Sequence, residues 1–144
     1  MRVIPTSLDG LVVVEPGVHR DGRGFFVEAF HTDRYATVGI ESTFVQDNHS
    51  RSTRSVIRGL HFQAAPGQPK LIRVARGRIF DVAVDIRLDS PTFGQHEAVI
   101  LDDVDHRQLF IPAGFAHGFA TVSEEADVTY NVGAYYDESL ERGL

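Results

Sequence analysis

The stretch Ile79-Phe80-Asp81-Val82-Ala83-Val84-Asp85-Ile86 decides the fold class of this chain of 144 residues. Its side chains alternate in character, and a period of two is typical of a β-strand. Asp81, Ala83 and Asp85 fall on one face of this strand, and the other face is wholly apolar. The acidic face either lines a polar cavity or forms the outside of a barrel, and periodicity alone leaves both possibilities open.

Further short β-rich runs lie on both sides of this strand, at residues 11–14, 25–27, 56–57, 71–74, 99–101, 109–111 and 128–130. Turn signals such as Asp21-Gly22 and Arg76-Gly77 separate them. Many short strands at regular spacing predict an all-β antiparallel sandwich or barrel. Only residues 32–38 resemble a helix, with Thr32 or Asp33 as the expected N-cap. We expect one β domain over residues 1–144.

The composition excludes several classes of protein. The absence of cysteine excludes a disulfide framework, a thiolate nucleophile and a cysteine-based metal site. The N-terminus lacks the apolar run that a signal peptide needs. No stretch approaches the roughly 20 apolar residues that span a bilayer. We therefore expect a soluble, cytoplasmic protein that binds neither membranes nor, at a net charge of −6, nucleic acid.

Basic residues nevertheless gather in one part of the chain, at Arg51, Arg54, Arg58, Lys70, Arg73 and Arg76. A local basic cluster in an acidic protein suits a small anionic ligand better than a polymer. A solvated strand face is an equally good interpretation of the charge pattern alone.

Three histidines, His49, His61 and His117, have unusual neighbours. They lie in the motifs Gln46-Asp47-Asn48-His49-Ser50, Arg58-Gly59-Leu60-His61-Phe62-Gln63 and Pro112-Ala113-Gly114-Phe115-Ala116-His117-Gly118-Phe119. On one regular strand Arg58 and His61 would point to opposite faces, unless Gly59 forms a β-bulge. The other histidines lack such neighbours, and we expect them at the surface: His19, His31, His96 and His106.

A metal site is one interpretation of these histidines. The pattern Pro112-x-Gly114-x-x-His117 resembles the second motif of the cupins, small β-barrels that often bind a metal. The first cupin motif needs a His-x-His pair, and Gln63 stands where its second histidine would be. A catalytic metal normally takes about three protein ligands, and only His61 and His117 can be placed. The cupin fold is therefore expected without a metal.

Acid–base chemistry is the other interpretation. The ordinary pKa of histidine, about 6.5, suits a proton shuttle, which makes His61 a candidate base. Tyr130, near Tyr135 and Tyr136, is a candidate acid, and Lys70 could stabilise a developing oxyanion. A base, an acid and a cation are what proton abstraction beside a carbonyl requires.

Several segments, in order along nearly the whole chain, together resemble the dTDP-4-dehydrorhamnose 3,5-epimerase family: residues 21–28, 46–50, 58–63, 70–71, 81–87 and 110–119. The resemblance implies a cupin jelly-roll barrel and a homodimer that exchanges N-terminal strands. It also implies no metal or organic cofactor, and a dTDP-4-dehydro-6-deoxyglucose-type substrate epimerised at C3, C5 or both.

The resemblance further implies roles for individual residues. His61 matches the base, Tyr130 the acid and Lys70 the cation near O4 of the sugar. Arg58 and His117 match polar groups around the sugar and phosphates. The remaining substrate-binding positions, which include those for the nucleotide and diphosphate, some reaching across the dimer, are Arg23, Phe26, Glu28, Gln46, Asn48, Tyr136 and Glu141.

One departure concerns the partner of the base. The family pairs its histidine with an aspartate in a C-terminal segment, and nothing before Leu144 matches that segment. We expect either that Asp81 or Asp85 takes this role or that activity is weak, because an orienting carboxylate fixes the tautomer of a histidine. A sugar-nucleotide-binding cupin without catalysis, a ketoisomerase and a metal-dependent cupin remain the rival interpretations.

Overall fold

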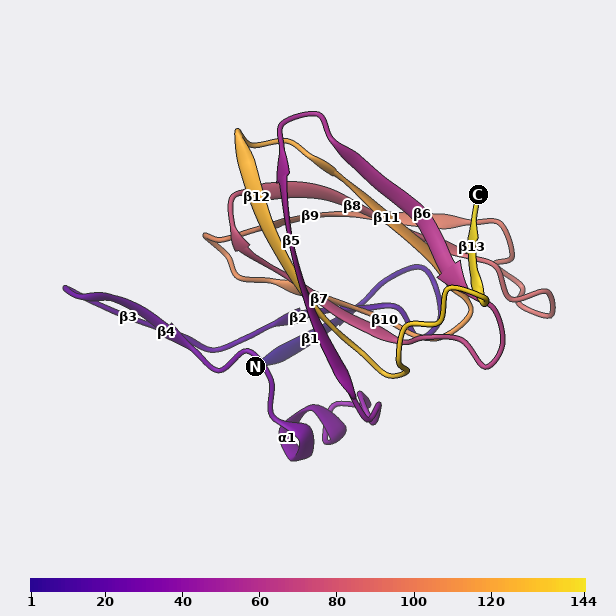
Figure 1. Cartoon of the computed structure of the whole chain (residues 1–144). Helices are drawn as coiled ribbons and strands as arrows, with labels where there is room; N and C mark the ends of the chain where they lie inside the picture. Colours follow the sequence, from indigo (N-terminus) through magenta and orange to yellow (C-terminus); the bar gives the residue numbers. More distant parts are fainter.

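Two antiparallel sheets packed face to face form the body of the protein in the computed structural model, which describes residues 1–144 (Figure 1). The six-stranded sheet has the spatial order β1 (Arg2–Pro5), β2 (Val12–Glu15), β10 (Gln108–Ile111), β7 (Lys70–Arg76), β12 (Glu125–Val132) and β5 (Gln46–Thr53). The five-stranded sheet has the order β13 (Glu141–Gly143), β6 (Ile57–Gln63), β11 (Phe115–Thr121), β8 (Arg78–Asp85) and β9 (His96–Asp102). The chain passes repeatedly from one sheet to the other, and this confirms the predicted jelly roll.

The strand β8 resolves the ambiguity of its acidic face. Asp81, Ala83 and Asp85 are fully buried, whereas Phe80 on the opposite face is 43% exposed. The interpretation that the carboxylates form the outside of the barrel is therefore wrong. Both carboxylates are tolerated inside because each accepts hydrogen bonds there, Asp81 from His117 and Asp85 from Arg87 and two hydroxyl groups.

The apolar core lies between the two sheets and includes Leu11, Ile72, Ile79, Leu101 and Leu109, none of them exposed. A second apolar cluster lies on the outer face of the six-stranded sheet, under the helix α1 (Thr32–Ala36). There Tyr35 packs with the strand residues that alternate with the core: Val14, Leu71 and Phe110. Its hydroxyl donates a hydrogen bond to the buried Gln108, so the helix is fixed by polar as well as apolar contacts.

The helix begins at Thr32, as predicted, but its cap and its end differ from the prediction. Its N-cap is His31, not Thr32 or Asp33, because His31 has an extended backbone and its Nδ1 accepts from the backbone N–H of Arg34 at 3.5 Å. The helix also ends at Ala36, short of the predicted Val38.

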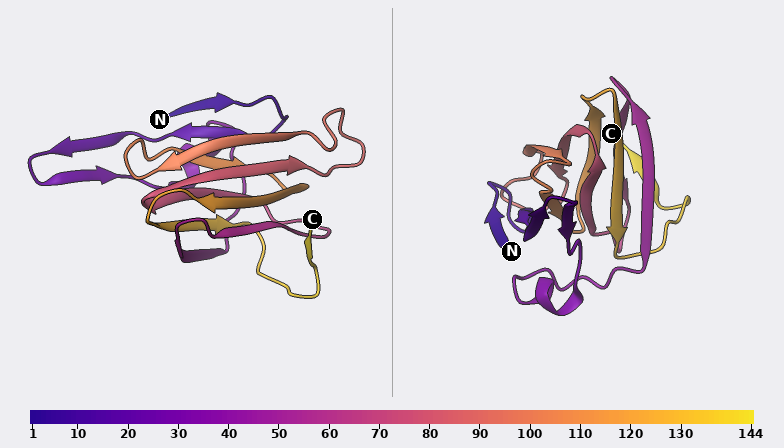
Figure 2. Two further views of the ribbon diagram at one scale, coloured as in Figure 1. Left: turned by 90° about the horizontal axis from the view of Figure 1, so that it is seen from above. Right: turned by 90° about the vertical axis from the view of Figure 1, so that its left-hand side faces the viewer.

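The hairpin β3 (Val18–Asp21) and β4 (Gly24–Val27) projects away from the sandwich (Figures 1 and 2). Its aromatic side chains are largely uncovered, Phe25 at 53% and Phe26 at 69% exposure. The ring of Phe25 in β4 lies 4.3 Å from the ring of His106, measured between centroids. His106 is only 7% exposed, so its predicted surface position is wrong, and the Phe25 ring is one of the groups that cover it. No helix of the structure is long and apolar enough to cross a membrane.

Candidate active site

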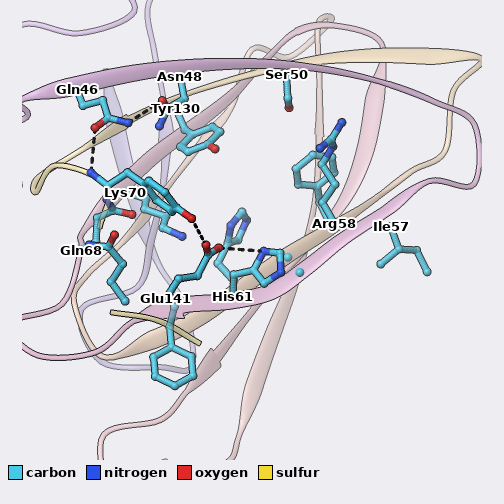
Figure 3. Close-up of a pocket in the computed structure, with 17 residues that line it drawn as sticks. Gln46, Asn48, Ser50, Ile57, Arg58, His61, Gln68, Lys70, Tyr130 and Glu141 are labelled. Carbon is cyan, nitrogen blue, oxygen red and sulfur yellow. Dashed lines mark hydrogen bonds and ion pairs between the residues drawn. The ribbon is translucent and has the colours of Figure 1, made fainter. Parts of the chain in front are cut away.

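A cavity of about 700 Å³ opens between the two sheets (Figure 3). Its volume lies in the range of small-molecule binding sites. It is lined by nine of the twelve site residues predicted from the sequence: Gln46, Asn48, Arg58, His61, Lys70, His117, Tyr130, Tyr136 and Glu141. The structure therefore brings together side chains from β5, β6, β7, β11, β12 and β13 that are far apart in the sequence.

The two sheets contribute different chemistry to the cavity. The five-stranded sheet supplies both imidazoles, His61 on β6 and His117 on β11. The six-stranded sheet supplies Lys70 on β7 and Tyr130 on β12. Figure 3 shows His61 and Tyr130 on different walls with space between them. A bound ring can therefore meet an imidazole on one side and a phenol on the other.

The structure contains the bulge at Gly59 that the sequence left as a possibility. His117 pairs with His61 across β11 and β6, but Phe119 pairs with Arg58, so β6 holds one extra residue in this interval. Gly59 has a φ of +102°, and a Cβ added there would lie 2.5 Å from the carbonyl oxygen of His117. Only glycine fits this position, and as a result Arg58 and His61 both line the cavity.

His61 is the more accessible of the two imidazoles, with 54% of its side chain exposed. Its Nδ1 lies 3.9 Å from Oε1 of Glu141, which is an ion-pair distance and longer than a hydrogen bond. The Tyr136 hydroxyl donates a hydrogen bond of 2.5 Å to the other oxygen of Glu141, and this bond raises the pKa of Tyr136 to about 12. Glu141 is thus the nearest carboxylate to the candidate base.

The expectation that Asp81 or Asp85 partners His61 is wrong. Strand β11 lies between β6 and β8, so the inward carboxylates of β8 are separated from His61 by a whole strand. Asp81 is accordingly bound to His117, whose Nε2 lies 3.0 and 2.9 Å from its two oxygens. Asp85 accepts from Arg87, and this hydrogen bond is the main cause of its pKa lying well below the usual range.

Burial shifts the two remaining candidate catalytic groups in opposite directions. Burial lowers the pKa of Lys70, and the negative charges of Asp81 and Glu141 oppose this effect. Burial raises the pKa of Tyr130, and the charge of Arg58 opposes that shift. Tyr130 therefore holds its proton at neutral pH, as a general acid must. No group of three or more His, Asp or Glu side chains is arranged to hold a metal ion.

Three predicted site residues lie outside the cavity. Arg23 and Phe26 belong to the projecting hairpin, where Arg23 pairs with Asp21 at 2.6 Å. Glu28 follows the hairpin and pairs with Arg34 at 2.6 Å. His49 points away from the cavity as well, on the outer face of the six-stranded sheet, with its Nε2 3.5 Å from Asp127.

The cavity also contains residues that the sequence patterns did not single out as site residues: Ser50, Gln63 and Gln68. Ser50 continues the alternation of Gln46 and Asn48 along β5, and this period of two was the available signal. Gln63 accepts from the backbone N–H of Asp137, and Gln68 donates to the carbonyl of Ala134. Both glutamines hold the loop that carries Tyr136, a long-range role that local patterns do not reveal.

Comparison with known proteins matches residues 5–144 to the family model of dTDP-4-dehydrorhamnose 3,5-epimerase. The enzyme of that name from Salmonella typhimurium is 50% identical over all of this chain and 80% of its own length. A dTDP-4-dehydrorhamnose 3-epimerase from Streptomyces niveus is 40% identical over all of this chain and 70% of its own length.

The fold agrees with a solved structure of this kind. The crystal structure of a dTDP-6-deoxy-D-glucose-3,5-epimerase from Legionella pneumophila, in complex with dTDP-4-keto-L-rhamnose, superposes with a TM-score of 0.97. It is 49% identical, and the match covers 99% of this chain and 77% of the other. The match supports a cupin-like jelly roll, and the chain belongs to the dTDP-4-dehydrorhamnose 3,5-epimerase family.

Proposed function

We propose that this protein epimerises a dTDP-4-dehydro-6-deoxyglucose-type sugar nucleotide, as a step in making a rhamnose-type deoxysugar. The observation that carries the proposal is the placement of His61 and Tyr130 on opposite walls of one cavity, which Lys70 also lines. Epimerisation needs a base and an acid on opposite faces of the sugar ring, because the proton leaves from one face and returns to the other.

The reaction follows from the chemistry of a ketone. The C4 carbonyl acidifies the C–H bond on each neighbouring carbon, C3 and C5. His61 takes a proton, the C–H electron pair moves into a new C=C bond, and the carbonyl π pair becomes charge on O4. Lys70 stabilises this enolate, and Tyr130 gives a proton to the carbon from the other face. No electrons are gained or lost overall, so the reaction as proposed needs no redox cofactor.

Arg58 is suited to the diphosphate of the substrate. Its Nε donates to the hydroxyl of Ser52 at 2.8 Å, which fixes the guanidinium at the cavity wall. A guanidinium fork matches the geometry of phosphate oxygens. Gln46 and Asn48, joined by a hydrogen bond of 2.9 Å, offer amide groups for the nucleotide nearby.

We also propose that the active protein is a homodimer in which the hairpin of one protomer completes the cavity of its partner. The cavity of a single chain contains neither Arg23 nor Phe26. Both lie on the projecting hairpin, where the side chain of Arg23 is 92% exposed and Phe26 is 69% exposed. An exposed aromatic ring beside an exposed guanidinium suits a nucleotide base and its phosphates, and a second copy would place them over the cavity.

NMR of a dTDP-4-keto-6-deoxy sugar in deuterated water tests the proposed activity. We expect deuterium to enter at carbons next to the ketone and the inverted sugar to accumulate. Binding without deuterium incorporation would favour a non-catalytic sugar-nucleotide-binding protein, and a product with its carbonyl at C3 would favour a ketoisomerase. Exchange at C3 alone would favour a single-carbon epimerase, the activity named for the Streptomyces niveus relative.

A further inference from the structure

We propose that Asp81 is a positioning residue that makes His117 a hydrogen-bond acceptor for a hydroxyl group of the sugar. The inference rests on the proposed function, because it assigns the sugar to the cavity that His117 lines. It extends that function by stating which kind of oxygen each wall of the cavity selects.

The contact between Asp81 and His117 is buried and exclusive. Asp81 is fully buried, and both of its oxygens lie within 3.0 Å of Nε2 of His117. No other side chain or backbone N–H donates to this carboxylate. A buried carboxylate needs a donor, so Nε2 of His117 must carry a hydrogen.

The state of Nε2 determines the state of Nδ1. In a neutral imidazole only one ring nitrogen carries hydrogen, so a protonated Nε2 leaves a lone pair on Nδ1. Nδ1 of His117 has no hydrogen-bond partner within the chain, yet it is not among the fully buried atoms without a partner. It is therefore accessible, and His117 lines the cavity. An acceptor in the cavity pairs with a hydroxyl group and not with a carbonyl.

The other groups at the cavity wall select the opposite kind of oxygen. Lys70 is a donor only, and its ammonium group is attracted by the negative charge of Asp81. Lys70 thus gives the buried carboxylate an opposite charge, so Asp81 does not depend on a charged His117 for compensation. The protonated hydroxyl of Tyr130 is a donor as well. The ketone oxygen is thus directed to Lys70, and a hydroxyl group to His117, which fixes the orientation of the sugar ring.

Nitrogen NMR of the ¹⁵N-histidine-labelled protein at pH 8 tests the tautomer without substrate. We expect His117, assigned by the loss of its signals in His117→Asn, to show a protonated Nε2 and an unprotonated Nδ1. A protonated Nδ1, in a neutral ring or in an imidazolium, would overturn the proposal. Asp81→Asn should shift His117 toward the Nδ1-protonated form. Asp85→Asn, which alters another buried carboxylate of β8, should leave the tautomer unchanged.

Binding of sugar analogues tests the hydroxyl. The wild-type protein should bind a dTDP-4-keto sugar about five- to a hundredfold more tightly than the analogue that lacks either the C2 or the C3 hydroxyl group. This ratio should fall toward one in Asp81→Asn and persist in Asp85→Asn. Equal ratios in Asp81→Asn and the wild type would refute the role of Asp81. Failure of the proposed function is distinguishable, because it would appear as absent deuterium exchange in a wild-type protein whose tautomer is measured independently.

Discussion

His61 on β6 and His117 on β11 lie directly opposite each other on neighbouring strands, so their imidazoles share the face of the sheet that lines the cavity. Their surroundings differ. Nε2 of His117 is hydrogen-bonded to the buried Asp81, and only 10% of the His117 side chain is exposed. His61 has no hydrogen bond of that kind and is 54% exposed. His61 is thus the more exposed of the two imidazoles, and we expect it to take the proton from the substrate.

Replacement of His61 by alanine should abolish deuterium incorporation at both carbons next to the ketone. General bases of this kind contribute about 100-fold to 10,000-fold to rate, so the loss should be at least about 100-fold. NMR of the sugar in deuterated water measures it. His49→Ala is the matched control, because His49 lies on the outer face of the six-stranded sheet. This variant should incorporate deuterium into the sugar at the wild-type rate. Retained exchange in His61→Ala would show that another group is the base.

The loss of activity at alkaline pH should follow the deprotonation of Lys70 and not that of Tyr130. Burial lowers the pKa of Lys70 from its usual 10.5 and raises that of Tyr130 from 10.0. As the pH rises, Lys70 therefore loses its proton first, and with it the charge that stabilises the enolate. As the pH is raised, kcat/KM should begin to fall at a pH lower than 10.5. In Lys70→Arg, whose guanidinium stays charged, this fall should move to higher pH. An unchanged alkaline limit in Lys70→Arg would assign it to another group.

Mixed dimers should reveal which protomer supplies the hairpin. Arg23→Ala and His61→Ala should each be inactive alone. If the hairpin reaches the partner's cavity, each mixed dimer holds one intact site, and equal amounts of the two variants should recover about a quarter of wild-type activity after subunit exchange. Light scattering would confirm the dimer. If activity stays at the background level after subunit exchange, each chain uses its own hairpin.

Replacement of Asp85 by asparagine should destabilise the fold without touching the cavity. Asp85 is fully buried and accepts from Arg87, Ser90 and Thr92, and removal of one partner from a buried ion pair costs about 3–5 kcal/mol. Asp89→Asn, an exposed change in the same loop, should cost under about 0.5 kcal/mol. Urea unfolding measures both, and equal stabilities of the two variants would contradict the prediction.

The carboxylate of Asp85 should also make the free energy of unfolding depend on pH in the acid range. Its folded pKa lies well below the usual 3.8, so the unfolded state binds a proton first as the pH falls. The stabilisation from Asp85 is therefore fully present above about pH 5 and is lost as the pH falls through the folded pKa. The difference in unfolding free energy between the wild type and Asp85→Asn should shrink in this acid range. A difference that stays constant from neutral pH to pH 2 would argue against an ionised Asp85.

Local patterns predicted the sheets well, because alternation in a strand such as 79–86 reflects two faces with different surroundings, although alternation did not reveal that the face with the carboxylates is the buried one. The glycine at 59 indicated where a bulge could form, also for a local reason. The partner of His61 was not predictable, since it depends on which strands are neighbours. Asp81 lies on the correct face, but β11 separates it from β6. The position of Arg23 and Phe26 away from the cavity also depends on the path of the whole hairpin.

The separation of exchange from inversion in Tyr130→Phe is the most direct test of a cavity with a base on one wall and an acid on the other. Phenylalanine keeps the ring of Tyr130 and removes only its hydroxyl. In deuterated water we predict that His61 still removes protons, so deuterium still enters next to the ketone while inverted product forms far more slowly than in the wild type. Inversion at the wild-type rate in Tyr130→Phe would contradict the account.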